Sequence, residues 1–306
     1  MNIQVIIPVY RPDDKLIKLI RALKKQTVKP TGITLVVSTT GKGTEPRISE
    51  AVAIAPEIRI LEVKASEFDH GGTRRWAVER TECDVFVMMT QDAVPNDEFL
   101  IERLTGAIEG NTACAYARQL AGSESSTFEK ISRLHNYPGA SVTKTKEDIE
   151  KLGIKAFFCS DVCCAYDREK YINAGGFIRK TIFNEDMIIA RKFLDLGYLV
   201  RYEADAAVIH SHDYSAMEQL KRNFDLGVSQ AQNPDVFAGV SSESEGMKLV
   251  KSATKILLKK GKWYMIPGFY AQCGFKLTGY KLGKNYAKLP EWVIMCLTSN
   301  KSYWKK

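Results

Sequence analysis

Two stretches of this chain combine residue types that suit the binding of phosphate and metal. Residues 66–75 read Ser-Glu-Phe-Asp-His-Gly-Gly-Thr-Arg-Arg, and their glycines and arginines are suited to holding an anion. Asp92 follows a short apolar run, residues 85–89. A buried strand that delivers a carboxylate at its C-terminal end is where open α/β sheets bind ligands. Together the two stretches indicate a site for a nucleotide phosphate and a metal ion.

Asp92 also has a simpler interpretation. A lone aspartate after a strand is often a turn residue, and residues 95–97, Pro-Asn-Asp, supply turn chemistry nearby. A divalent cation that bridges a diphosphate takes most of its coordination from phosphate and water, so one carboxylate and one further protein ligand suffice. The metal hypothesis for Asp92 therefore depends on a second ligand elsewhere in the chain.

The tripeptide Asn184-Glu185-Asp186 allows two interpretations. Asn184 is a suitable N-cap, and acidic residues in a first helical turn interact favourably with the helix dipole. Alternatively, one of the two carboxylates is a general base. Glycosyl transfer to a sugar hydroxyl needs such a base within hydrogen-bond distance of the hydroxyl proton. The residues alone leave both interpretations open.

His210 and His212 follow another apolar run. If that strand continues to residue 212, both side chains lie on one face, because residues two apart share a face. Histidine on a strand is usually hydrogen-bonded or at the surface. A neutral imidazole here could instead complete a metal shell that begins with Asp92.

The elements that must position these residues alternate between strand and helix. Apolar periodicity predicts strands at 3–9, 33–37, 59–63 and 85–89, with helices at 15–25 and 73–80. Such alternation indicates a parallel sheet with helices on both faces. Beyond it we expect loops and a helix over 123–148, strands at 156–166 and 199–210, and a helix over 184–196 that Gly197 ends. Gly41-Lys42-Gly43 is expected to be a loop.

Composition and charge bound the class of protein. The 306 residues, 45% hydrophobic and 26% charged, are ordinary for a folded soluble chain. The net charge of +8 is uneven: residues 246–306 hold thirteen Lys and one acid, or +12, which leaves −4 for residues 1–245. We expect a cytoplasmic protein, because the N-terminus shows no signal-peptide pattern and no window approaches the ~20 apolar residues of a membrane span.

The cysteines are expected to be reduced and mostly buried. Cys159, Cys163 and Cys164 cluster in sequence, but the seven cysteines form no Cys-x-x-Cys pair that would indicate zinc.

Taken in order, these motifs resemble the GT-A-fold glycosyltransferases of family 2. They are most similar to bacterial rhamnosyltransferases that build cell-wall and O-antigen polysaccharides. The resemblance covers roughly residues 2–230, and the segments that carry it are Ile6–Tyr10, Phe68–Arg74, Thr90–Ala93, Gly175–Phe177, Asn184–Asp186 and His210–His212. It implies an α/β fold of the GT-A, Rossmann-like type: a mixed, mostly parallel sheet flanked by helices, with a basic helical C-terminal extension.

The resemblance also implies an activity and a set of site residues. The activity is inverting, metal-dependent transfer of L-rhamnose from dTDP-β-L-rhamnose to a hydroxyl of a lipid-linked saccharide. Asp186 would be the base and Glu185 would shape the acceptor pocket. Asp92 and His212, with His210 a less favoured alternative, would bind Mg²⁺ or Mn²⁺. The residues expected at the nucleotide sugar are Pro8, Tyr10, Arg11, Ser38, Asp69, His70, Gly71, Gly72, Arg74, Gln91 and Asp92.

Three departures from the family pattern affect this expectation. Ser38-Thr39-Thr40 stands where the family commonly has an acidic pair that holds the pyrimidine, so Asp69 is considered in its place. Arg75 replaces an expected Asn, and Ala93 removes a second carboxylate. A UDP-sugar transferase and a non-catalytic carbohydrate-binding scaffold therefore remain alternatives. A nucleotidyltransferase is a third, although the Gly-rich N-terminal loop of such enzymes is missing.

The chain is expected to divide at about residue 235. Residues 1–235 would be the catalytic domain, with a nucleotide-binding half (1–120) and an acceptor-binding half (121–235). Residues 236–306 mix lysine with aromatic residues, which suits docking on the inner face of a membrane. Packing on the catalytic core and pairing with a second copy, as a homo-oligomer, are alternatives. Nucleic acid is not an expected partner, because residues 246–306 contain no arginine.

Overall fold

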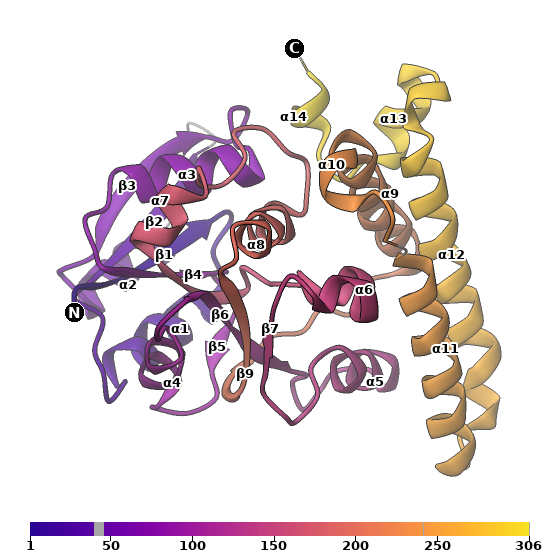
Figure 1. Ribbon diagram of the computed structural model, residues 1–306, viewed down its shortest axis with the longest axis horizontal. Coiled ribbons are helices and arrows are strands. Elements are labelled where there is room, and N and C mark those ends of the chain that lie inside the picture. The colour runs from indigo at the N-terminus through magenta and orange to yellow at the C-terminus, as the bar shows by residue number, and fades with distance from the viewer. Residues whose placement is uncertain (40–45, 241, 306) are drawn as a thin grey trace. The chain divides into compact units, whose positions relative to one another are not determined.

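The structure, a computed structural model, describes residues 1–39, 46–240 and 242–305 (Figure 1). Thr40 and the Gly41-Lys42-Gly43 segment lie outside these residues. The chain forms two compact units. The first comprises residues 1–122, 137–180 and 185–210, and the second comprises residues 123–136, 181–184 and 211 onward.

The first half of the sheet in the first unit is parallel. Its strands run in the order β3-β2-β1-β4, with bounds β1 (Ile3–Val9), β2 (Gly32–Thr39), β3 (Arg59–Lys64) and β4 (Val85–Met89). The intervening helices are α1 (Asp14–Lys24), α2 (Pro46–Ile54) and α3 (His70–Glu79). The predicted strand–helix alternation is therefore confirmed. The carboxyl ends of β1, β2 and β4 lie at one edge of the sheet, which is where parallel strands place a ligand.

The second half makes the sheet mixed. β8 pairs antiparallel with β4 and β6, β6 pairs parallel with β9, and β5 and β7 pair antiparallel with β9. These strands are β5 (Val94–Pro95), β6 (Thr112–Leu120), β7 (Val142–Lys144), β8 (Cys163–Asp167) and β9 (Leu199–Ile209). The helices of this part are α4 (Leu100–Gly106), α6 (Asp148–Leu152), η1 (Gly153–Ala156), α7 (Arg168–Asn173) and α8 (Glu185–Asp195). The predicted mixed sheet flanked by helices is thus confirmed.

Each face of the sheet buries a different set of side chains. Ile3, Val5 and Ile7 of β1 pack with apolar residues of α1, α2 and α4. On the other face, Phe86 of β4 stacks on Tyr166 of β8 with 4.9 Å between ring centroids, near Phe177. Figure 1 shows α3, α7 and α8 on this second face. Buried strands with both faces covered explain the continuous apolar runs in the sequence.

One strand expectation needs correction, and one strand was not predicted. The strand predicted over 156–166 is wrong in its first half: η1 ends at Ala156, a loop follows, and β8 begins only at Cys163. Phe157 is fully buried in that loop, so it resembles a strand residue in the sequence. β6 has no predicted counterpart, because its alanines have low strand propensity.

The second unit is helical, as the expected C-terminal extension requires. Its elements are α5 (Thr127–Asn136), α9 (Ala216–Gln232), α10 (Pro234–Phe237), α11 (Ser242–Lys259), η2 (Trp263–Met265), α12 (Ile266–Lys284), η3 (Tyr286–Lys288), α13 (Glu291–Leu297) and α14 (Lys301–Trp304). Among the described residues, no helix has both the length and the apolarity that crossing a bilayer demands.

Helices α9 and α12 approach each other through glycine. A Cβ added at Gly279 would lie 2.1 Å from the carbonyl oxygen of Leu220, and one at Gly283 would lie 2.0 Å from that of Phe224. On the facing helix, a Cβ at Gly227 would lie 2.4 Å from the carbonyl oxygen of Tyr280. The two backbones are therefore in direct contact, as in small-residue helix crossings.

Candidate active site

The end of β1 is held against the loop that follows β4. The backbone N–H of Tyr10 donates to Gln91 Oε1 at 2.8 Å, and Gln91 Nε2 donates back to the Tyr10 carbonyl at 3.0 Å. The Arg11 guanidinium lies over the Tyr10 ring, 5.1 Å from its centroid. Gln91 therefore has a defined positioning role, and it brings this edge of the sheet together beside Asp92.

Asp92 faces a histidine across this edge. Nε2 of His210 lies 3.5 Å from Asp92 Oδ1, and His210 is buried at 8% exposure. On its other side, His210 Nδ1 lies 3.0 Å from Gln119 Oε1. The Gln119 amide nitrogen donates to Tyr137 and Ser160, so its oxygen is assigned as the acceptor from His210.

This hydrogen bond fixes the His210 tautomer. With the proton on Nδ1, the lone pair of neutral His210 is on Nε2 and points toward Asp92. A ligand histidine held through its other ring nitrogen is the usual arrangement in metal sites. One carboxylate oxygen and one imidazole nitrogen at this separation fit a divalent cation that takes its remaining ligands from phosphate and water.

His212 belongs to the second unit, two residues along the chain from His210. Its ring stacks on Tyr214 with 5.0 Å between centroids. The predicted role of His212 as a metal ligand stays a prediction. The sequence alone could not indicate the orientation of His210, because that orientation depends on a contact with Gln119.

Asp69 caps helix α3. Its Oδ1 accepts from the backbone N–H groups of Gly71 and Gly72 at 3.0 and 2.8 Å. A Cβ on either glycine would lie within 2.4 Å of a carbonyl oxygen, that of Ile178 or Arg179. The two glycines are therefore explained by the cap and by backbone contact. Their expected contact with an anion stays a prediction, as do the nucleotide roles of Asp69 and His70.

Arg74 lies inside a buried ionic cluster. It is 6% exposed, its Nε is 3.2 Å from Asp161 Oδ2, and its Nη1 is 3.1 Å from Glu185 Oε1. His70 Nδ1 is 3.7 Å from the same Glu185 oxygen. Two carboxylates thus surround the guanidinium that the sequence assigned to a diphosphate, and that assignment stays untested.

Asp186, the expected base, is tied to the same cluster. Its Oδ2 accepts from the backbone N–H of Asp161 at 3.2 Å, and its Oδ1 accepts from the N–H of Met187 at 2.7 Å. Asp161 in turn accepts from the Tyr166 hydroxyl at 2.6 Å. Sequence reasoning missed Asp161, although an acid inside the apolar run 156–166 was a usable signal, because buried acids are rare unless paired.

The three carboxyl groups of the cluster differ in the direction of their pKa shifts. Burial opposes ionisation of Glu185, but Arg74 and then His70 overcome it and hold the Glu185 pKa at about 2. Burial raises the pKa of Asp161 to about 8 against the pull of Arg74. Burial, followed by the charges of Glu185 and Asp161, raises the pKa of Asp186 well above its usual value. A carboxylate of raised basicity is suited to accept a proton near neutral pH.

Arg75 stabilises a turn. Its Nη1 donates to the carbonyl oxygens of Gly175 and Phe177 at 2.7 and 3.1 Å, and its Nε pairs with Glu79 at 2.8 Å. This gives a structural role to the charge that departs from the family pattern.

A cleft of about 650 Å³ opens at the ends of β2 and β3, next to the start of α3. Its lining includes Thr39, Asp69 and Trp76. Ser38, buried near the end of β2, is adjacent in sequence to Thr39 of this lining, and Pro8 of β1 pairs with Val36 of β2. The volume is in the range of pockets for small organic ligands.

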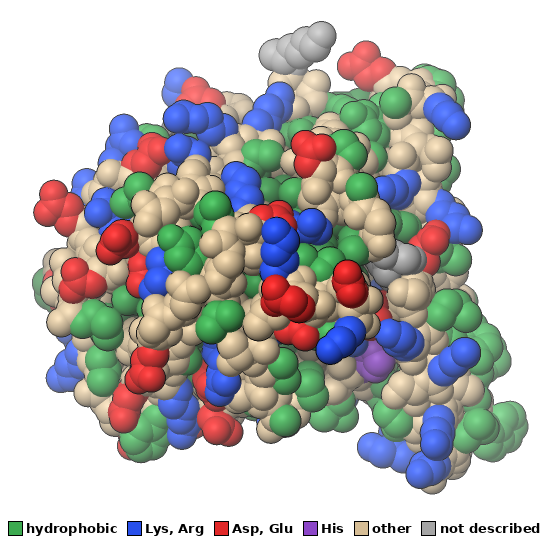
Figure 2. Space-filling model, in the orientation of Figure 1, with side chains coloured by type: hydrophobic (Ala, Val, Ile, Leu, Met, Phe, Trp, Pro, Cys, Tyr) green, Lys and Arg blue, Asp and Glu red, His purple; other side chains and the backbone are tan. Residues whose placement is uncertain are grey.

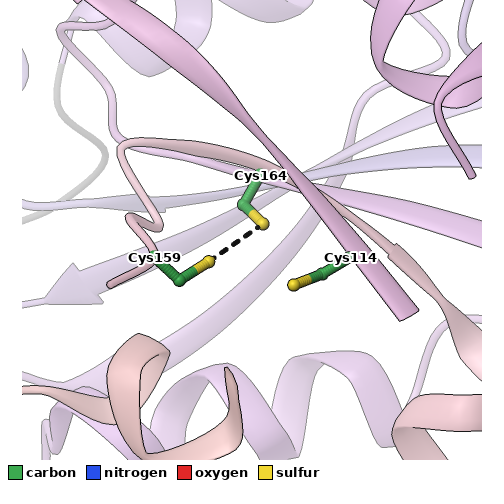
Figure 3. Close-up of side chains that lie close together, drawn as sticks. All are labelled: Cys114, Cys159 and Cys164. Atoms are coloured by element: carbon green, nitrogen blue, oxygen red, sulfur yellow. Dashed lines mark hydrogen bonds between the residues drawn. The ribbon is translucent and has the colours of Figure 1, made fainter. Parts of the chain in front are cut away.

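Three buried thiols lie close together in the other half of the sheet (Figure 3). Cys114 of β6, Cys164 of β8 and Cys159 of the preceding loop place their Sγ atoms within 4.8 Å of one another. Cys159 and Cys164 are 3.5 Å apart and hydrogen-bonded. The seven cysteines form no disulfide in the described residues and four are buried, which confirms the expectation that most of the thiols are buried.

Comparison with known proteins identifies relatives of this chain. Residues 4–174 match the family described as Glycosyl transferase family 2. The O-antigen chain rhamnosyltransferase RfbN of Salmonella typhimurium is 36% identical over 99% of this chain and 96% of its own length. The O-antigen chain rhamnosyltransferase WbaN of Salmonella anatum is 34% identical over 92% of this chain and 89% of its own.

Solved structures share the fold at low sequence identity. The mannosyltransferase PcManGT of Pyrobaculum calidifontis, in complex with GDP-Man and Mn²⁺, superposes with a TM-score of 0.64 at 12% identity, covering 94% of this chain and 88% of that one. S. aureus TarS 1–349 in complex with UDP-GlcNAc gives a TM-score of 0.53 at 12% identity, covering 94% and 92%. At these identities the likeness concerns the fold.

Proposed function

Because this chain belongs to glycosyl transferase family 2, we propose that it is a rhamnosyltransferase of bacterial O-antigen or related surface polysaccharide synthesis. The observation that carries the proposal is the 36% identity to RfbN across nearly the whole of both chains. The expected family and the expected glycosyltransferase activity are confirmed. The donor, dTDP-β-L-rhamnose, and the lipid-linked saccharide acceptor are the finer parts of the proposal.

Asp186 is the proposed base for an inverting displacement. The acceptor hydroxyl loses its proton to Asp186 as its oxygen attacks the anomeric carbon of the donor, while the bond to the nucleotide diphosphate breaks on the opposite side. A β-linked donor then gives an α-L-rhamnoside. The raised pKa of Asp186 supports this role, because a general base is most efficient when its pKa approaches the working pH.

Asp92 and a histidine are the proposed ligands of Mg²⁺ or Mn²⁺. We favour His210 over His212 because the hydrogen bond to Gln119 orients His210 Nε2 toward Asp92. When bound, the ion would neutralise charge on the diphosphate leaving group. The hydrogen bond from Gln119 holds the His210 donor atom in place.

The cleft beside Thr39 and Asp69 is the proposed nucleotide pocket, together with Pro8, Tyr10, Arg11 and Ser38 at the neighbouring strand ends. Residues 1–235 are proposed as the catalytic domain and residues 236–306 as an accessory region. We further propose that the enzyme works at the inner face of the cell membrane, where a lipid-linked acceptor is anchored.

A donor screen tests this function directly. The purified full-length chain is incubated with Mn²⁺ and with dTDP-L-rhamnose, UDP-sugars or GDP-sugars, and donor hydrolysis and binding are measured. We expect dTDP-L-rhamnose to bind and turn over most efficiently. A preference for UDP-sugars would keep the family and overturn the rhamnose assignment.

A further inference from the structure

The turn between α11 and α12 exposes aromatic side chains. We call residues 258–264 the hairpin tip. Within it, Trp263 is 68% exposed, Tyr264 65% and Leu258 56%. Figure 2 shows hydrophobic side chains together with Lys and Arg over this end of the hairpin, at the lower right. Large apolar side chains grouped at a surface mark an interaction site more often than isolated ones do.

The charged residues within the hairpin tip all have one sign. Lys259 and Lys260 are exposed and Lys262 is partly exposed, and no acid occurs in the sequence between Glu245 and Glu291. The hairpin tip therefore combines tryptophan, tyrosine and leucine with three ammonium groups. Aromatic rings beside lysines are suited to the boundary between acyl chains and anionic headgroups.

The rest of the hairpin end is packed, so this exposure does not result from a frayed helix end. Leu257 and Phe269 flank the tip on the two helices and are buried against Ile131 of α5. Phe128 of α5 lies 5.4 Å from Phe269 between ring centroids. The Lys262 ammonium also donates to Thr127 Oγ1 at 3.4 Å. The exposed rings are carried by a supported turn.

We propose that the hairpin tip docks the protein on a membrane surface rich in anionic lipid, with Trp263, Tyr264 and Leu258 entering the interface and Lys259, Lys260 and Lys262 meeting the headgroups. This proposal rests on the proposed function, in which the enzyme acts at the inner face of the cell membrane, and names the surface that would bind there. A second copy of the chain is a less suitable occupant, because two such tips would bring like charges together without an acidic counterpart.

Vesicle sedimentation tests the proposal. The full-length protein is mixed with vesicles of phosphatidylcholine or of equal parts phosphatidylcholine and phosphatidylglycerol. We expect binding to the mixed vesicles, weakened by salt, and little binding to phosphatidylcholine alone. Equal binding to both, or none to either, would overturn the proposal. So would a dimer, seen by light scattering, whose dissociation requires the same tip substitutions.

Two double variants locate the contact. Near an anionic surface each lysine strengthens partitioning about fivefold, so Lys259→Gln with Lys260→Gln should weaken binding about twenty-fivefold. Trp263→Ser with Tyr264→Ser should weaken it on the order of tenfold through lost interfacial burial. All four side chains are exposed, so folding should be unaffected, and an unchanged melting temperature checks this.

Matched controls separate the hairpin tip from general charge and aromaticity. Lys281→Gln with Lys284→Gln removes the same charge from exposed positions at the far end of α12, about 30 Å away along the helix. Trp292→Ser removes a tryptophan that is 71% exposed on α13. Both should leave binding within about twofold. The two lysines lie beyond a screening length of about 8 Å from the tip, and Trp292 lies outside the hairpin tip. Losses equal to those of the tip variants would overturn the proposal.

Activity distinguishes this proposal from the proposed function. With a soluble saccharide acceptor, the tip variants should keep the transfer rate of the unmodified protein. Failure of every protein to transfer rhamnose would count against the function, whereas loss of vesicle binding in the tip variants alone would support the docking surface.

Discussion

At the scale of single residues, Arg74 has more acidic neighbours than it can neutralise. Its guanidinium contacts Asp161 and Glu185, and Asp186 is joined to Asp161 through a backbone hydrogen bond. One positive charge facing three carboxyl groups favours retention of a proton by the cluster. The pKa directions place that proton on the aspartates, because Glu185 is held ionised.

Asp186→Asn should abolish transfer while donor binding survives. An amide cannot accept the hydroxyl proton, so we expect turnover to fall about a thousandfold. Turnover is measured with dTDP-L-rhamnose, and binding of dTDP by calorimetry. Asp195→Asn, at the other end of the same helix, is the control and should change neither. Retained turnover in Asp186→Asn would show that another group is the base.

Asp161→Asn should move the pH dependence of transfer. The proposed base acts when deprotonated, so the rate should rise with pH through the pKa of Asp186. Removal of the Asp161 charge lowers that pKa, and the acid limb of kcat/KM should shift to lower pH. The other titratable groups that act on the two aspartates are Glu185, Arg74, Tyr166 and Cys159. An unmoved limb in a protein that melts normally would contradict the assignment.

His210→Ala and His212→Ala should differ in their effect on metal. Because His210 faces Asp92, its loss should weaken the Mn²⁺-dependent part of dTDP binding by at least about tenfold. His212→Ala serves as the matched variant and should cause a smaller loss. Calorimetry with and without Mn²⁺ measures both. A larger loss in His212→Ala than in His210→Ala would instead support His212 as the metal ligand, as the sequence predicted.

At the scale of elements, apolar runs predicted the positions of several strands well, whereas the start of the helix beside the site was predicted less well. β1 and β4 begin and end where their apolar runs do, at Ile3–Val9 and Val85–Met89. Helix α3 begins at His70 rather than Thr73, because Asp69 caps it and two glycines continue it. Asp69 followed by a helix was therefore a cap signal available from the sequence.

The residues that sequence reasoning missed act through tertiary contacts. Gln119 orients His210 from 91 positions away, and Asp161 reaches Asp186 through a loop that the sequence suggested was a strand. No local periodicity reports such contacts. The order of motifs identified the chemistry, but the partners that orient each group are visible only in the folded chain.

Two glycines on α12 should respond oppositely to alanine. Gly283→Ala places a methyl group against the Phe224 carbonyl, so we expect it to destabilise the protein by about 1–3 kcal/mol. Gly274 has no atom within 4 Å of an added Cβ, and Gly274→Ala should stabilise by about 0.5–1 kcal/mol through helix propensity. Urea denaturation measures both. Equal effects would contradict the close crossing of α9 and α12.

At the scale of the whole molecule, the segment that carries the basic charge does not coincide with a separately folded unit. The basic excess lies in residues 246–306, but α12 from that segment packs directly on α9, which precedes it. The basic segment is therefore part of a folded unit, although its charge suggests a separate tail.

A chain that ends at Gly246 should therefore lose stability as well as membrane affinity. Without α12, the buried face of α9 with Leu220, Phe224 and Val228 is left to solvent. We expect aggregation or a lowered melting temperature, measured by size-exclusion chromatography and calorimetry. The full-length tip variants are the control, since they keep this packing. A truncated chain that stays monomeric and melts normally would show that α9 does not depend on the segment.

The pair of hydrogen bonds between Gln91 and Tyr10 has a thermodynamic consequence. They fix the end of β1 and the loop after β4 in the free protein, so these segments have little conformational freedom left to lose when a donor arrives. Rigidity that exists before binding reduces the entropic penalty of association. The end of β1 and the loop after β4 are in this sense preorganised, and their contribution to nucleotide affinity depends on the quality of their contacts more than on any ordering of these two segments.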